Sequence, residues 1–230
     1  MANYQIKPDR DRPNGWRAFS LFGIPVYIEA GFFLLIAFYF ISDAARGSIN
    51  IPEVGLWSFV VFFSILAHEM GHALTARLCG CGQIRVSLVM LGGLAHHSPT
   101  TRGRSILICL AGPLFGLTLG VLAYAFYREP ILSIGPEGAM SQVLAMLILV
   151  NIFWTFFNLL PMYPLDGGQT LFHALTYWLD PRRALVWTAR VSMLAAAVAG
   201  TIAYQKDITF VALLCGFSFL TNLQMSGILR

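Results

Sequence analysis

Charged residues are scarce in this sequence of 230 residues, of which only 11% are Asp, Glu, Lys or Arg. Soluble domains carry about a quarter charged residues, whereas here 57% of residues are hydrophobic and the mean hydropathy is +0.69. This composition excludes an ordinary soluble domain and predicts a protein in a lipid bilayer. Cysteine is also rare, and no C-x-x-C spacing occurs, so we expect reduced thiols at Cys79, Cys81, Cys109 and Cys215.

Long apolar runs fill most of the chain, and each is close to the roughly 20 residues that cross a bilayer. We therefore predict an all-α polytopic membrane protein with about six transmembrane helices. The spans are expected near residues 24–42, 55–79, 105–127, 140–160, 184–204 and 208–227. Glu29 interrupts the first run, and the preceding LFGIPVYI has strand-like content, so this span could start at Ala30. Six spans leave no length for a separate soluble domain, which predicts one membrane-embedded domain over residues 1–230.

The basic residues are dispersed among the loops, which argues against a nucleic-acid partner. Their distribution indicates orientation instead, because cytoplasmic loops are enriched in Lys and Arg. With the N-terminus inside, twelve basic residues fall on the inner side and three on the outer side. The inner set is Lys7, Arg10, Arg12, Arg17, Arg77, Arg85, Arg102, Arg104, Arg182, Arg183, Arg190 and Arg230, and the outer set is Arg46, Arg128 and Lys206. We predict a multi-pass protein of the cell membrane with a cytoplasmic N-terminus.

The segment SILAHEMGHALTA places three ionisable side chains inside the second apolar run. His68 and His72 are four residues apart, so both imidazoles project from one face of a helix and can reach one metal ion. Glu69 is placed to act as the general base toward a water molecule. Ionisable residues at the bilayer centre cost roughly 2.5–3.5 kcal/mol and persist mainly where they function. The motif therefore predicts one catalytic zinc ion per chain.

A third protein ligand is expected, because catalytic zinc sites use three and leave one position open. Asp166 lies in NLLPMYPLDGG, where prolines end the fourth run and two glycines permit a tight turn. In the predicted topology, this carboxylate and HEMGH reach a similar depth toward the cytoplasmic side. His96, His97 and His173 remain rivals for the third position.

At these motifs the sequence resembles the site-2 protease family of intramembrane zinc metalloproteases. The resemblance rests on AHEMGH, on AGPLFG (residues 111–116) and on NLLPMYPLDGG, in this order and spacing. It implies that His68, His72 and Asp166 bind the metal and that Glu69 is catalytic. The chain resembles a minimal form, without the PDZ or nucleotide-sensing CBS domain of some relatives. Many relatives have a histidine at the position of Glu29, which leaves that residue without an assigned role.

The resemblance also implies a function and partners. The expected reaction is hydrolysis of a peptide bond within or next to a transmembrane segment of another membrane protein, in the lipid bilayer. An adaptor or inhibitor protein could take part in substrate choice. The side-chain amide of Asn158, which opens the NxxP motif, could hydrogen-bond the developing oxyanion or could serve in helix packing.

Two segments resemble the membrane-associated strands of that family, near residues 18–28 and 84–97. A substrate helix must unwind before water can attack, and an edge strand could hold it extended through backbone hydrogen bonds. We predict that residues 86–94 form this edge, which includes Val89 and Leu91.

Two other functions remain open at this point. A metal or proton transporter would also place His, Glu and Asp inside membrane spans. The absence of paired motifs in two halves of the chain argues against it. A chaperone that binds transmembrane helices without cleaving them would need no general base, and Glu69 disfavours that interpretation.

Overall fold

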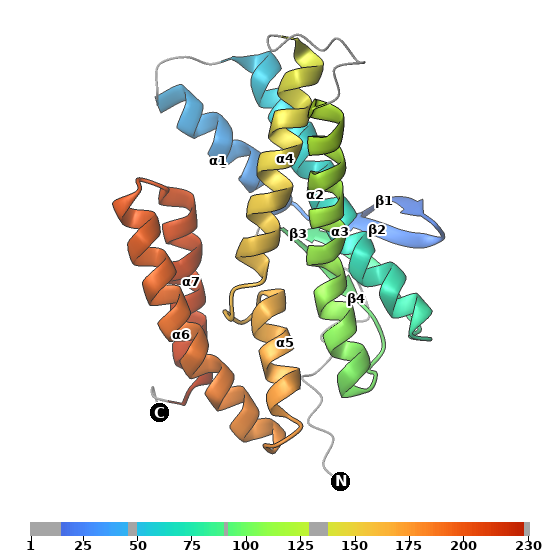
Figure 1. The fold of residues 1–230 in the computed structure, drawn as a ribbon, viewed down its shortest axis with the longest axis vertical. Helices are drawn as coiled ribbons and strands as arrows, with labels where there is room; N and C mark the ends of the chain where they lie inside the picture. Colours follow the sequence, from blue (N-terminus) through green and yellow to red (C-terminus); the bar gives the residue numbers. More distant parts are fainter. Residues whose placement is uncertain (1–14, 46–49, 90–91, 129–137, 228–230) are drawn as a thin grey trace. The chain divides into compact units, whose positions relative to one another are not determined.

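The computed structural model describes residues 15–45, 50–89, 92–128 and 138–227. These residues form seven helices and four strands (Figure 1). The chain divides into two compact units, which we describe separately. The sheet unit comprises the described residues of 15–99 and 111–155. The helical unit comprises residues 100–110 and 156–227.

The sheet unit contains a small sheet of four strands in the order β1-β2-β3-β4. Strand β1 (Trp16–Leu21) pairs antiparallel with β2 (Ile24–Ile28), β2 pairs parallel with β3 (Arg85–Val89), and β3 pairs antiparallel with β4 (Gly92–His96). The β1–β2 hairpin turns at Phe22 and Gly23, whose φ angles of 51° and 76° suit a two-residue hairpin loop. The predicted strand segments near residues 18–28 and 84–97 are confirmed.

The sheet order corrects one prediction. Strand β3 is an interior strand, hydrogen-bonded to β2 on one side and to β4 on the other, so Val89 does not lie on a free edge. The edge on this side of the sheet is β4. Leu91 lies outside the described residues.

The apolar runs form helices, but their number as membrane spans differs from the prediction. Four helices of the described residues are long and apolar enough to cross a bilayer. They are α2 (Ile51–Leu78), α3 (Arg102–Arg128), α4 (Ala139–Asn158) and α6 (Pro181–Gln205). Helix α1 (Phe32–Ala45) has 14 described residues and α7 (Thr209–Met225) has 17, fewer than the roughly 20 residues of a typical membrane span. The protein is therefore a largely helical membrane protein with a small sheet, and the count of six spans is not confirmed.

The first predicted span, near residues 24–42, is wrong at its start, whereas the alternative start at Ala30 lies within two residues of the helix. Residues 24–28 are strand β2, and the backbone N–H of Glu29 donates to Leu88 O at 2.9 Å, which extends the pairing with β3. The helix begins only at Phe32. Glu29 consequently lies between a strand and a helix rather than inside a span.

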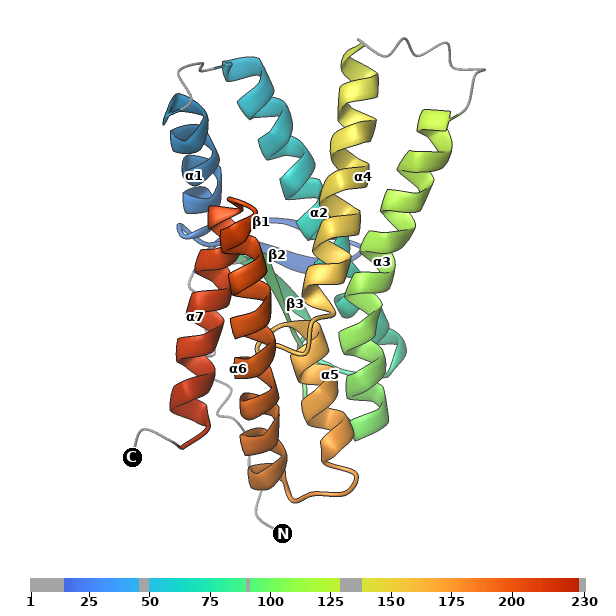
Figure 2. The same ribbon diagram turned by 60° about the vertical axis from the view of Figure 1, so that its left-hand side comes forward.

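In the helical unit, α6 and α7 lie side by side in both views (Figures 1 and 2). Their buried faces are lined by small side chains such as Ala196 and Cys215, which pack with the buried Met162 from the turn before α5 (Asp166–Leu175). Asp180 caps α6 by accepting a hydrogen bond from the backbone N–H of Arg183 at 3.1 Å. All four cysteines are free thiols, as predicted.

Candidate metal centre

Helix α2 carries the three motif residues in its second half, and all of them are buried. His68, Glu69 and His72 are each less than a tenth exposed. The four-residue spacing brings the two imidazoles to the same face of the helix. The prediction that His68 and His72 could share one ion is thus compatible with the local fold of α2.

The distance between the two imidazoles can be compared with zinc coordination. Nε2 of His68 and Nε2 of His72 are 3.2 Å apart, and the rings are inclined by 78°. Two nitrogens that each lie about 2.0–2.1 Å from a tetrahedral zinc ion are separated by about 3.4 Å. The two nitrogens therefore already lie near the spacing of two ligands on one tetrahedral ion.

Glycines of α3 make room for these imidazoles. A Cβ atom at Gly112 would overlap the ring of His72, so only glycine fits there. In return, a Cβ at Gly71 of α2 would meet Ala111 O and Phe115 Cβ, each at 2.8 Å. The AGPLFG segment thus serves as a close helix contact beside the motif. Close approach through small residues is a common way for membrane helices to pack.

The edge strand lies against the proposed general base. A Cβ atom at Gly93 of β4 would overlap the side chain of Glu69 and would come within 2.6 Å of its Oε1. The backbone of β4 therefore passes directly beside this carboxylate. Sequence reasoning did not identify Gly93, although two adjacent glycines in an apolar strand are a sign of close backbone approach.

Two buried polar side chains of α4, Asn151 and Thr155, bond α2 and α3 in the region of His68, and sequence reasoning missed them. Asn151 donates a hydrogen bond to Ser64 Oγ of α2 at 2.9 Å, and Thr155 Oγ1 donates to Pro113 O of α3 at 3.1 Å. A Cβ at Gly116 would lie 3.2 Å from Thr155 Oγ1 and 3.8 Å from His68 Nδ1. These buried polar groups therefore lie in the same region of the apolar helices as His68.

In the helical unit, Asp166 is the first residue of α5 and is buried. A carboxylate at this position is favoured by the partial positive charge of a helix N-terminus. The two following glycines are required by the fold, because a Cβ at Gly167 would overlap Leu159 O and one at Gly168 would overlap the backbone of Tyr163. The turn therefore folds back tightly onto the start of α5.

The three predicted ligands form a suitable donor set. Two imidazoles and one carboxylate are a common set for catalytic zinc, and each of His68, His72 and Asp166 is buried. Among the described residues, none of the three rival histidines lies in a cluster of possible metal ligands.

The rival histidines have other surroundings. His96 ends β4 opposite Arg85 of β3. Burial, with the positive charges of Arg85 and His97, lowers the pKa of His96 below its ordinary value. The ring of His97 bonds Ser98 O at 2.8 Å through Nδ1. His173 lies in the last turn of α5. Asn158, the last residue of α4, is buried in the helical unit.

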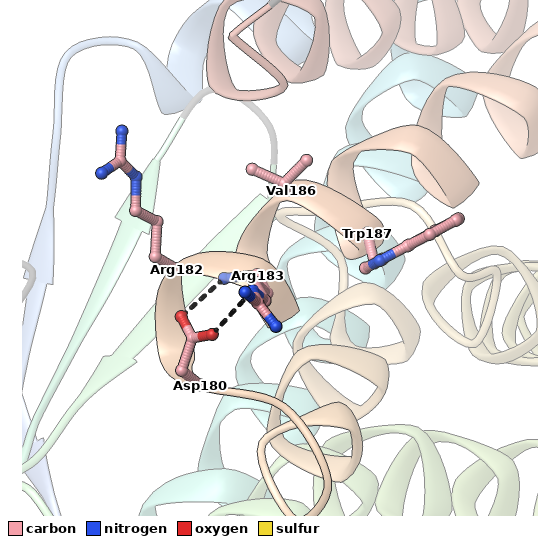
Figure 3. A pocket seen from close by; sticks show the side chains of 5 residues that line it. All are labelled: Asp180, Arg182, Arg183, Val186 and Trp187. Carbon is pink, nitrogen blue, oxygen red and sulfur yellow. Dashed lines mark hydrogen bonds and ion pairs between the residues drawn. The ribbon is translucent and has the colours of Figure 1, made fainter.

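A surface hollow at the start of α6 is no alternative centre. It is lined by Asp180, Arg182, Arg183, Val186 and Trp187 (Figure 3). Its carboxylate caps the helix and also pairs with Arg183 Nε at 3.2 Å. Cationic side chains otherwise dominate this hollow, which disfavours a metal cation.

The sequence was compared with protein-family models and with known proteins, and both comparisons point to metalloproteases. Residues 56–135 and 131–199 match the model of peptidase family M50. A Synechocystis protein whose name proposes a zinc metalloprotease is 31% identical over 172 residues, which cover 69% of this chain and 43% of that protein. A zinc metalloprotease of Methanocaldococcus jannaschii is 27% identical over 158 residues, covering 67% and 44%. The chain thus spans less than half the length of these relatives.

A solved structure shares the fold. The site-2 protease from Methanocaldococcus jannaschii superposes with a TM-score of 0.69 at 23% sequence identity. The alignment covers 92% of this chain and 95% of that one.

Proposed function

Because this chain belongs to peptidase family M50, we propose that it is an intramembrane zinc metalloprotease. It would hydrolyse a peptide bond within or next to a transmembrane segment of a membrane-protein substrate. The observation that carries this proposal is the buried His68, Glu69 and His72 group inside α2, a helix apolar enough to span a bilayer. Burial of three ionisable side chains in such a helix is costly and is typical of a functional site.

In this proposal, His68, His72 and Asp166 hold one zinc ion, and Glu69 is the general base. When bound, zinc supplies Lewis acidity, which polarises a carbonyl oxygen and makes water more acidic. Glu69 takes a proton from the attacking water and returns it to the leaving amine. The amide of Asn158 donates a hydrogen bond to the developing oxyanion.

The substrate segment would bind in an extended form along β4. The support is the sheet order, which makes β4 an edge, and the close approach of Gly93 to Glu69. A peptide added to this edge would run beside the general base, with its backbone paired and its peptide bonds no longer hidden in a helix.

The remaining features are proposed from the pattern of charge and hydropathy. Counting α1 and α7 as the first and last spans gives six spans in one membrane-embedded domain, with the N-terminus and active site toward the cytoplasm of a cell membrane. The support is the excess of Lys and Arg on one side of this arrangement.

The decisive experiment compares the wild type with Glu69→Gln on a single-span membrane protein, with zinc content measured on both. The expected result is cleavage by the wild type only, with about one zinc ion on each protein, since Gln cannot accept the proton. Cleavage by both proteins would refute the role of Glu69. Zinc-dependent transport without cleavage, or binding of the span without cleavage by either protein, would refute the protease.

A further inference from the structure

The backbone of Tyr163 is held on both sides by side chains of two helices. Its N–H donates to Ser192 Oγ of α6 at 2.8 Å. Its carbonyl oxygen accepts from Asn222 Nδ2 of α7 at 2.6 Å and from Ser218 Oγ of α7 at 3.2 Å. Ser192 and Asn222 are both 0% exposed, so these bonds are shielded from water and lipid. Both polar groups of one peptide position are thus bound by the α6–α7 pair.

Tyr163 precedes Asp166 by three residues, and the turn between them is tightly packed. Leu165 N donates to Met162 O at 2.7 Å. The fully buried Met162 packs in the core with Ala196 of α6 and Cys215 of α7. At the start of α5, Gly168 lies so close to Tyr163 that a Cβ atom would come within 2.6 Å of Tyr163 Cα. A shift of Tyr163 would therefore be passed on to Asp166.

The partners of Asn222 indicate its role. A buried amide in an apolar helix is costly unless it is hydrogen-bonded, and most such residues bond a neighbouring helix. The Nδ2 of Asn222 instead bonds Ser218 O of its own helix at 2.8 Å and the main chain of the turn. The amide therefore joins the turn to α7 through hydrogen bonds.

We propose that Asn222, together with Ser192 and Ser218, is a positioning residue for the metal ligand Asp166. The α6–α7 pair fixes the main chain of the ligand-bearing turn, and this fixes the start of α5 where Asp166 projects. This inference rests on the proposed function, because it takes Asp166 to be a zinc ligand.

The test uses the purified full-length chain with Asn222→Leu and Ser192→Ala. Zinc affinity is measured by competition with a chelator, and the absorption spectrum of the cobalt-substituted protein reports the ligand geometry. Loss of a group that hydrogen-bonds a ligand directly lowers metal affinity by about 10–100-fold. Asn222 acts through the main chain of the turn, so we expect a loss at the lower end, about tenfold, for Asn222→Leu. Ser192→Ala removes a single atom, so it tests the same idea even if the bulkier change impairs folding.

Matched controls come from the same helices. Among the described residues, the hydroxyls of Thr221 of α7 and Thr201 of α6 each bond a carbonyl of their own helix alone, Phe217 O at 2.9 Å and Ala197 O at 2.8 Å. Their valine variants should leave affinity within about twofold and the cobalt spectrum unchanged. A purely structural role of Asn222 would lower protein yield without changing the spectrum of the folded protein.

Asp166→Asn in the same series separates the two proposals. If it changes neither affinity nor spectrum, Asp166 is not a ligand, and the proposed ligand set is wrong. If it changes both while Asn222→Leu and Ser192→Ala behave like the valine controls, the positioning role is overturned. Loss of affinity with an altered spectrum in all three variants would support both proposals.

Discussion

Gly112 of α3 lies so close to the imidazole of His72 that a single added methyl group would overlap the ring. The α2–α3 contact therefore sets the position of a proposed ligand, in addition to packing two helices together. Glycine is required at residue 112 because the ring of His72 occupies the space that any side chain there would need.

We expect Gly112→Ala to weaken zinc binding. Overpacking a tight contact costs about 1–3 kcal/mol, and 1.4 kcal/mol corresponds to about a tenfold loss of affinity. Chelator competition measures the change. Gly55→Ala on α2 is the control, because a Cβ at Gly55 would meet nothing within 4 Å. Equal affinity of both variants would contradict the assigned role of this contact.

Gly93→Ala should reduce cleavage while zinc remains bound. The new methyl group would displace the Glu69 side chain, and misplacing a catalytic group by about 1 Å can cost about a hundredfold in rate. Turnover of a single-span substrate and zinc content are measured together. Gly82→Ala, at an open position before β3, should retain both turnover and zinc content. Undiminished turnover of Gly93→Ala would argue against Glu69 acting beside β4.

The Asn151–Ser64 hydrogen bond between α4 and α2 should show measurable coupling. Polar pairs between membrane helices contribute about 0.6 kcal/mol on average and up to about 1.7 kcal/mol. A double-mutant cycle with Asn151→Leu and Ser64→Ala should therefore give a coupling of about 1 kcal/mol in the free energy of unfolding. Within the part of the chain that the structure describes, the Thr118 hydroxyl bonds Leu114 O of its own helix alone. Thr118→Val paired with Ser64→Ala should therefore give no coupling.

His96 should make the fold less stable in acid. Its pKa is lowered in the folded state by burial and by the charges of Arg85 and His97, whereas an unfolded histidine titrates near about 6.5. Below that pH the unfolded chain binds a proton that the folded chain still excludes, so the free energy of unfolding falls as the pH falls. His96→Gln should remove this part of the loss, measured by unfolding between about pH 8 and pH 5. If the free energies of unfolding of wild type and His96→Gln change equally with pH, His96 does not contribute to the loss of stability in acid.

Much of the candidate site was accessible from local patterns. The spacing of His68 and His72 was enough to place both imidazoles on one helix face, because helical geometry depends only on the backbone period. Hydropathy located α2, α3, α4 and α6 within a few residues. It failed near residue 24, because a short β-branched apolar strand and the start of a helix have the same mean hydropathy.

Other features depend on contacts between segments far apart in the chain. The order of the strands, which makes β3 interior and β4 the edge, follows from pairing with residues about sixty positions away. The need for glycine at Gly93 and Gly112 arises from neighbours on another element. The residues next to a glycine in the sequence do not show that another element passes this close to it.

The sequence by itself determined that this is a membrane protein with a buried HExxH helix and a carboxylate after the Pro-rich turn, because composition and helical spacing are properties of the chain alone. Only the tertiary structure decided what surrounds these residues. In the sequence, Asn222 is simply a polar residue in an apolar run. Its amide gains the carbonyl of Tyr163 as a partner only when the turn packs against α6 and α7. Hydrogen bonds between distant segments are set by packing, which the local sequence does not encode.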